Sequence, residues 1–95
     1  MFTINVWLTV QDSGNVEKVR GLLTEAARLS GEEPGCERFE VYHSPADETR
    51  FLLCEHWATK EAWEVHRDAK AFQEIYKPQV LPLVEREAHV STRVV

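Results

Sequence analysis

The segment from Arg50 to Trp57 holds four consecutive apolar residues, Phe51-Leu52-Leu53-Cys54, and ends in a tryptophan. Turn-forming residues precede it, which is typical of a β-strand. A strand with one solvent face alternates apolar and polar side chains, whereas a strand that is apolar on both faces is usually buried on both. We therefore expect both faces of this strand to be covered, which limits the folds open to a chain of 95 residues.

Three further segments alternate apolar and polar side chains with the period of two that predicts a strand: residues 3–10, 37–43 and 89–95. The turn residues between 43 and 50 predict that the second and third strands form a hairpin. A symmetric register of that hairpin puts Arg38 opposite Glu55, a charge pair worth ~0.2–1 kcal/mol.

Two segments have apolar residues at the steps of three and four that predict amphipathic helices. The first covers residues 16–30 and ends before Pro34-Gly35. The second begins after Thr59, a residue type that caps helices. Pro78 and Pro82 are expected to break this second segment, so that residues 79–87 form a short separate helix or turn.

The order β-α-β-β-α-β is that of a ferredoxin-like α+β sandwich, formed by one domain over residues 1–95. Two helices cover only one face of such a sheet. Trp7 and Tyr42 fall on the other face, together with part of the third strand. Packing this face on a second copy by two-fold symmetry predicts a homodimer. The alternative is that scattered surface aromatics need no partner.

Composition excludes several classes of function. A net charge of −5 with no basic cluster argues against nucleic-acid binding. No apolar run approaches the ~20 residues of a membrane span, and the N-terminus lacks the pattern of a signal peptide. We therefore expect a cytoplasmic protein. Cys36 and Cys54 are expected to be reduced thiols, with a disulfide as the alternative, and their spacing does not predict a metal site.

Four short motifs together resemble the antibiotic biosynthesis monooxygenase (ABM) family, and the likeness covers nearly the whole chain. They are Glu33-Pro34-Gly35-Cys36, Phe39-Glu40-Val41-Tyr42, Glu55-His56-Trp57, and Ala62 to His66. The resemblance implies a small α+β barrel formed by a dimer. It also implies one of several activities, since the family includes cofactor-free quinol and polyketide oxygenases, haem-degrading oxygenases, and an isomerase of a phosphorylated autoinducer breakdown product.

Only some of the family's functional positions are matched by the residues of this chain. Family members often carry His-x-x-Thr-Pro-His followed by an aromatic residue or Met in the second helix, and this chain keeps only His66 and Phe72 of that motif. In the haem-degrading branch an Asn, a Trp and an axial His recur. Asn5 matches the first, but His66 stands at the Trp position and Tyr76 at the ligand position, so the resemblance disfavours haem degradation.

His66 is the residue that we expect to carry chemistry. It lies on the sheet-facing stripe of the second helix, and its ordinary pKa near 6.5 suits a base that takes a proton from a phenol or quinol hydroxyl. The resemblance adds that the resulting anion passes an electron to dioxygen without metal or flavin. The alternative is a histidine that fills a gap in the core with one hydrogen bond.

Other residues have a functional and a structural interpretation. The amide of Asn5 can donate to a developing oxyanion, or it is a polar group at the dimer interface or sheet edge. Glu55 can orient the substrate or His66, or it pairs with Arg38.

Tyr76 can hydrogen-bond a substrate carbonyl, or it lies on the rim of the site. Trp63 and Phe72 can line an apolar pocket for an aromatic ligand, although aromatic residues at helical spacing are commonly core.

The leading hypothesis is therefore a cofactor-independent monooxygenase, an oxidoreductase acting on a small aromatic or quinol-type substrate, with no cofactor and no metal. One rival is an isomerase of a small phosphorylated sugar derivative, for which Arg67 and Lys70 are the nearby cations. The other is a dimer that binds a hydrophobic small molecule without catalysis.

Overall fold

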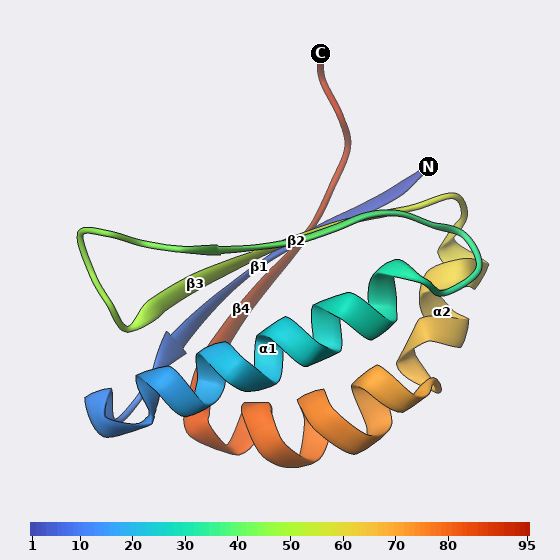
Figure 1. Ribbon diagram of the computed structural model, residues 1–95. Coiled ribbons are helices and arrows are strands. Elements are labelled where there is room, and N and C mark those ends of the chain that lie inside the picture. The colour runs from blue at the N-terminus through green and yellow to red at the C-terminus, as the bar shows by residue number, and fades with distance from the viewer.

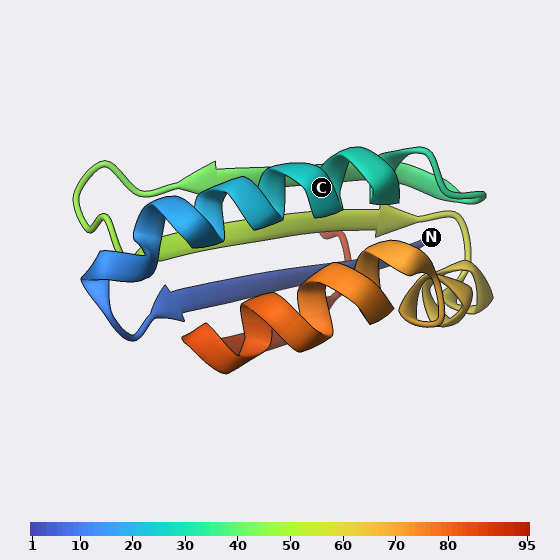
Figure 2. The same cartoon turned by 60° about the horizontal axis from the view of Figure 1, so that its bottom comes forward.

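Four antiparallel strands form one sheet in the order β2-β3-β1-β4 in the computed structural model, which describes residues 1–95. The helices cover a single face of this sheet (Figures 1 and 2). This confirms the predicted ferredoxin-like α+β fold. The elements are β1 (Phe2–Val10), η1 (Ser13–Asn15), α1 (Val16–Gly31), β2 (Cys36–His43), β3 (Arg50–Trp57), α2 (Lys60–Arg67), η2 (Ala71–Val80), η3 (Leu81–Leu83) and β4 (Val84–Ser91).

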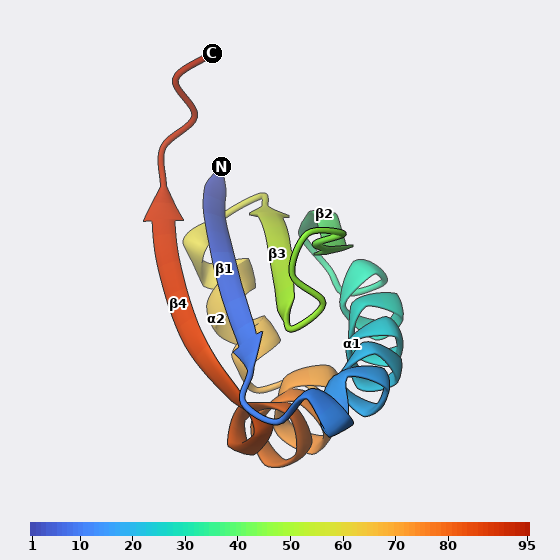
Figure 3. The ribbon, with the colours of Figure 1, turned by 90° about the vertical axis from the view of Figure 1, so that its left-hand side faces the viewer.

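The core lies between the sheet and the helices α1 and η2. The alternation of β1 turns every second side chain toward these helices; the four from Ile4 to Val10 are buried, and Phe2 is partly buried against them. They pack with residues of α1, β3 and η2. Figure 3 shows the strands side by side, with β4 at the edge opposite β2. The core residues are Ile4, Val6, Leu8, Val10, Val16, Val19, Leu23, Phe51, Leu53, Tyr76, Val80 and Val84.

The loop between α1 and β2 is held close to α2 by a glycine. Gly35 has φ +81°, a conformation that side chains rarely adopt, and a Cβ added there would lie 2.6 Å from Cβ of Ala62. The predicted cap of α2 is confirmed, since Thr59 Oγ1 accepts a hydrogen bond from the Ala62 backbone N–H at 3.1 Å. Glycine therefore allows this loop and the first turn of α2 to touch.

The hairpin register differs from the symmetric one. A bulge between Cys36 and Arg38 shifts the pairing, so that Phe39 lies opposite Glu55 and Arg38 opposite His56. Arg38 forms an ion pair with Glu40 instead, at 3.3 Å. The predicted Arg38–Glu55 pair is wrong, because the extra residue in β2 turns the two side chains to opposite faces of the sheet.

The segment after α2 also differs from the prediction. Helix η2 is a π-helix that continues through Pro78 to Val80, so Pro78 does not end it. Proline lacks an N–H and its ring crowds the carbonyl four residues earlier. Here that carbonyl, of Glu74, accepts a hydrogen bond from Gln79 Nε2 at 2.9 Å.

Strand β4 begins at Val84 and ends at Ser91, so a separate helix or turn over residues 79–87 and a strand over 89–95 are both wrong in extent. The sequence pattern does not predict the first part of β4 as a strand, because the side chains from position 85 to 90 are exposed on both faces of the sheet. An edge strand of this kind has no apolar alternation to reveal it.

The third strand alternates in burial although it does not alternate in hydropathy. Its buried positions face the helices, while Leu52 and Cys54 are only half-buried on the opposite face. Tyr42, 52% exposed, and Trp7 share that open face. A single chain therefore leaves this face uncovered. Cys36 and Cys54 are free thiols. None of the helices has the combination of length and apolar character that a membrane span requires.

Candidate active site

A cavity of about 740 Å³ lies between the sheet and the helices α2 and η2. Five of the six residues predicted for the site line it, namely His66, Glu55, Trp63, Phe72 and Tyr76. They come from β3, α2 and η2, so the fold brings together side chains from three separate elements. Eleven of the 20 lining residues are hydrophobic, which gives the cavity a largely apolar wall.

Asn5 is the predicted site residue that the structure keeps apart. It lies on the open face of the sheet, opposite Cys54 on one side and His89 on the other. Its Nδ2 donates a hydrogen bond to Ser91 Oγ at 3.4 Å. The thickness of the sheet separates Asn5 from His66 within one chain.

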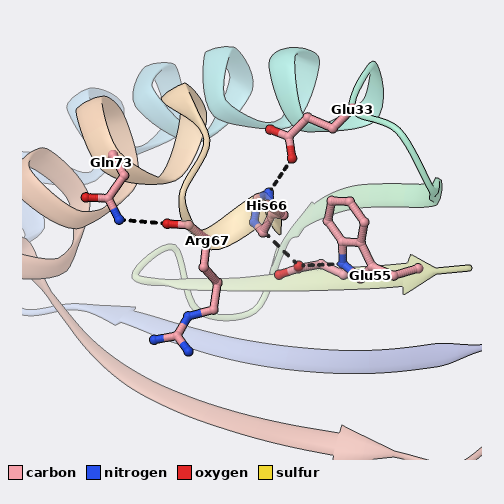
Figure 4. A network of polar contacts seen from close by, with 6 residues as sticks. Glu33, Glu55, His66, Arg67 and Gln73 are labelled. Atoms are coloured by element: carbon pink, nitrogen blue, oxygen red, sulfur yellow. Dashed lines mark hydrogen bonds and ion pairs between the residues drawn. The ribbon is translucent and has the colours of Figure 1, made fainter. Parts of the chain in front are cut away.

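His66 is held between two carboxylates from different elements (Figure 4). Its Nδ1 lies 2.8 Å from Glu33 Oε1, and its Nε2 lies 4.0 Å from Glu55 Oε1. The carboxylate of Glu33 accepts hydrogen bonds when ionised, so Nδ1 of a neutral ring carries the proton and donates it. The lone pair is then on Nε2, the nitrogen that faces Glu55.

Burial decides the charge state of this imidazole. His66 is 5% exposed, and aromatic rings surround it, with the Trp57 centroid 4.6 Å and the Phe72 centroid 5.9 Å away. Burial lowers the pKa of His66 below its ordinary value, and the hydrogen bond to Glu33 partly opposes this. The imidazole is therefore neutral near pH 7 and able to accept a proton.

Glu55 is a buried acid on the floor of the cavity. Its side chain accepts a hydrogen bond from Trp57 Nε1 at 3.1 Å. Burial raises the pKa of Glu55 to about 7, against the hydrogen bond from Trp57 and the charge of Arg86. A carboxyl group with this pKa exchanges a proton near neutral pH, which is the property required of a general acid or base.

Tyr76 and the aromatic residues form the other walls. Tyr76 is buried, its Oη accepts a hydrogen bond from Arg86 Nε at 3.1 Å, and burial raises the pKa of its phenol. The rings of Phe72 and Tyr76 lie 5.3 Å apart. Trp63 stacks on Phe2 with a centroid distance of 4.8 Å. These contacts fix the aromatic wall before any ligand binds.

The sequence did not identify Glu33, Trp57 or Arg86 as site residues. In the sequence Glu33 belongs to a short family-like motif without a chemical role of its own, and Arg86 lies in the segment expected to be a short helix or turn. The sequence feature that could have identified Glu33 is Gly35, two residues later. A glycine that allows a loop to pack against α2 also brings the neighbouring loop residues close to that helix. Of the two cations proposed for the isomerase, Arg67 lines the cavity and Lys70 does not.

The residues of the cavity offer acid–base groups and no recognisable metal site. No group of three or more His, Cys, Asp or Glu side chains is placed to hold a metal ion. What the arrangement supplies is a neutral imidazole and a carboxyl group that titrates near pH 7, both facing an aromatic-lined space.

Comparison with known proteins agrees with this architecture. A protein from Nitrosomonas europaea, described provisionally as an antibiotic biosynthesis monooxygenase, superposes with a TM-score of 0.91 at 22% identity, covering 100% of both chains. SnoaB, a cofactor-independent oxygenase from Streptomyces nogalater, superposes with a TM-score of 0.85 at 14% identity, covering 99% of this chain and 93% of its own. At such identities the likeness establishes the fold.

Comparison with curated proteins gives no match. The family model for antibiotic biosynthesis monooxygenases matches residues 1–78, which include β1 to β3, α1, α2 and most of η2. The matched part contains every cavity residue discussed above except Arg86. The chain therefore belongs to the antibiotic biosynthesis monooxygenase family.

Proposed function

We propose that the protein is a cofactor-independent monooxygenase that oxidises a small aromatic substrate of the quinol type. One observation carries the proposal. The Glu33 carboxylate holds Nδ1 of His66, which leaves the basic Nε2 of a neutral imidazole at an apolar, aromatic-lined cavity. SnoaB, which shares the fold, is a cofactor-independent oxygenase, and this likeness supports the same class of chemistry here.

In this proposal His66 Nε2 takes the proton of a substrate hydroxyl. The resulting oxyanion is electron-rich and transfers electrons to dioxygen. For a naphthoquinol, one oxygen atom enters the ring carbon next to a hydroxyl, the other leaves as water, and the ring becomes a hydroxyquinone. The quinol supplies all four electrons, so the balance needs no external reductant. Glu55 Oε1 lies 4.0 Å from Nε2, so the carboxyl group faces the base without a hydrogen bond to it.

The character of the cavity wall favours this substrate over a sugar. Eleven hydrophobic lining residues and the paired rings of Phe72 and Tyr76 suit a flat aromatic molecule. The isomerase remains the second candidate because three cations, Arg67, Lys77 and Arg86, line the same cavity. An isomerase would exchange a substrate carbon-bound proton with deuterated water without consuming oxygen.

We also propose that residues 1–95 act as one domain and that two copies pair through the open face of the sheet. Tyr42 and Trp7 on that face support the pairing, as does the half-buried Leu52. Pairing would place Asn5 at the interface, away from the cavity of its own chain. Sedimentation at micromolar concentration tests this, and a species of only the 11.0 kDa chain mass would reject it.

The function is tested by oxygen uptake with a panel of metal-free quinols. We expect uptake by the wild type and a loss of at least ~100-fold in His66→Gln, the lower end of the range for removing a general base. His89→Gln is the matched control, because the His89 ring is exposed, contacts only the Glu87 carboxylate and does not line the cavity. Absence of uptake across the panel would reject the oxygenase, and uptake unchanged in His66→Gln would reject His66 as the base.

A further inference from the structure

Three cations line the cavity without a carboxylate partner. Arg67, Lys77 and Arg86 all face this space, and none of them forms an ion pair within 4.0 Å. The carboxylates that share the lining are Glu55, Glu64 and Asp68. Glu55 is turned toward Trp57 and His66, so the cavity holds guanidinium groups that no carboxylate of the protein neutralises.

Arg86 and Tyr76 form a pair of donors. Arg86 uses Nε to donate to Tyr76 Oη at 3.1 Å, and this is the one side-chain hydrogen bond that either residue makes. The phenol proton of Tyr76 and the two Nη groups of Arg86 are therefore left to donate elsewhere. A guanidinium group with a hydroxyl group beside it can donate one hydrogen bond to each of the two oxygens of a carboxylate.

Arg67 adds a second charge on an aromatic support. Its guanidinium lies 5.2 Å from the Trp63 ring centroid and 5.8 Å from that of Phe72. In Figure 4 the side chain points away from Glu33 and His66, toward the side of the cavity formed by β1 and β4. Arg86 projects from β4 into the same cavity. The positive charge is thus gathered at the β4 side, and the acid–base groups at the other.

The sheet register gives the separation of these two ends. Glu55 pairs with Ile4, which pairs with Val90 on β4. Arg86 is four residues before Val90, so its backbone is offset from that of Glu55 by ~13 Å along the strands and by two strand spacings of ~4.8 Å across the sheet. The long side chain of Arg86 spans part of this distance. The remaining space suits one or two fused rings with a reactive hydroxyl at one end and an anionic group at the other.

We propose that the substrate is an aromatic carboxylate, bound with its carboxylate on Arg86 and Tyr76 Oη and its reactive hydroxyl toward His66. The inference deepens the proposed function and rests on it for the reacting end of the substrate. The anion subsite itself is inferred from the free hydrogen-bond donors of Arg86 and Tyr76. We therefore expect the affinity for a ligand to depend on its carboxylate, whether or not the ligand is turned over.

Two matched probes test the subsite: 1,4-dihydroxy-2-naphthoate and 1,4-dihydroxynaphthalene, which differ only in the carboxylate. Calorimetric titration under nitrogen prevents oxidation and measures binding alone. We expect the wild type to bind the acid at least ~10-fold more tightly than the diol, as for a charge-assisted bidentate pair. Arg86→Gln should reduce this preference to less than about threefold without changing the affinity for the diol, and Arg86→Lys should retain part of it.

Arg20→Gln is the control, because it removes the same charge from an exposed position on α1 that does not line the cavity. Its preference should equal that of the wild type. Equal affinity for the two probes, no binding of the acid, or a preference that survives Arg86→Gln would each overturn the subsite. A preference for the acid without oxygen uptake would uphold the subsite and reject the oxygenase, and uptake with equal affinities would do the reverse.

Discussion

Glu33 and His66 lie 33 positions apart in the sequence, yet Glu33 Oε1 is 2.8 Å from His66 Nδ1. The contact joins the loop after α1 to the last turn of α2. It sets which ring nitrogen bears the proton, and it links the acid–base chemistry of the cavity to the conformation of a loop.

Replacing Glu33 with Gln should lower the pKa of His66 further. The carboxylate of Glu33 raises this pKa through its hydrogen bond and its charge, whereas burial lowers it. Without the carboxylate, the lowering by burial is no longer offset. The pKa is measured from the ring-proton shifts of His66 by NMR titration. Glu32→Gln, one residue away, is the control and should leave the titration unchanged. An unaltered or higher pKa in Glu33→Gln would show that the contact is not made in solution.

The protonation of Glu55 should make stability depend on pH in an unusual direction. The folded protein binds this proton up to about pH 7, whereas the unfolded chain releases it near pH 4.5. Stability from this group is therefore present below pH 4.5 and is lost as pH rises to 7. The full difference corresponds to ~3 kcal/mol, at 1.36 kcal/mol for each pKa unit.

Urea denaturation of the wild type and Glu55→Gln at pH 5 and pH 8 checks this. We expect the wild type to lose more stability between the two pH values than the variant does. His66 acts in the opposite direction, because its lowered pKa makes the folded state gain stability as pH rises toward 6.5. The comparison with Glu55→Gln cancels that contribution, and an equal pH dependence in both proteins would contradict the raised pKa.

The sequence predicted the elements whose pattern is set by burial on one side. The alternation of residues 3–10 and the spacing of residues 16–30 match β1 and α1 to within a residue. The cap at Thr59 was found because the donor it satisfies is local. The same logic placed His66 and Phe72 on the inner face of the helical segment, and both line the cavity.

The errors lie where non-local contacts override local pattern. The bulge before Arg38 changed the hairpin register, and the freed Glu55 became a buried acid of the site. Pro78 did not end its helix because Gln79 supplies a donor in its place. Arg86 was missed because the edge strand that carries it has no apolar face to reveal it. Local periodicity contains none of this information.

Gln79→Ala tests whether the side-chain donor stabilises the π-helix. Gln79 Nε2 donates to the Glu74 carbonyl at 2.9 Å, and its loss should lower the free energy of unfolding by ~0.5–1.5 kcal/mol, the usual worth of a hydrogen bond. Gln11→Ala provides the comparison, since Gln11 is exposed and makes no side-chain hydrogen bond. Equal effects of the two substitutions on denaturant midpoints would mean that the Gln79 bond contributes nothing.

Two glycines respond in opposite directions to the same substitution. Gly35→Ala places a Cβ 2.6 Å from Ala62 Cβ in a backbone with φ +81°, so it should destabilise the fold by at least ~1–3 kcal/mol and loosen the loop that carries Glu33. Gly21→Ala adds a Cβ to α1 with nothing within 4 Å, and should stabilise by ~0.5–1 kcal/mol.

Thermal and urea unfolding of the two variants gives both values against one wild type. The Gly35→Ala variant should also lose the effect of Glu33 on the His66 titration, whereas Gly21→Ala should retain it. If Gly35→Ala were as stable as Gly21→Ala, the close approach of the loop to α2 would be absent in solution. The contact between Glu33 and His66 would then have no structural support, because Gly35 is what allows the loop to reach the helix.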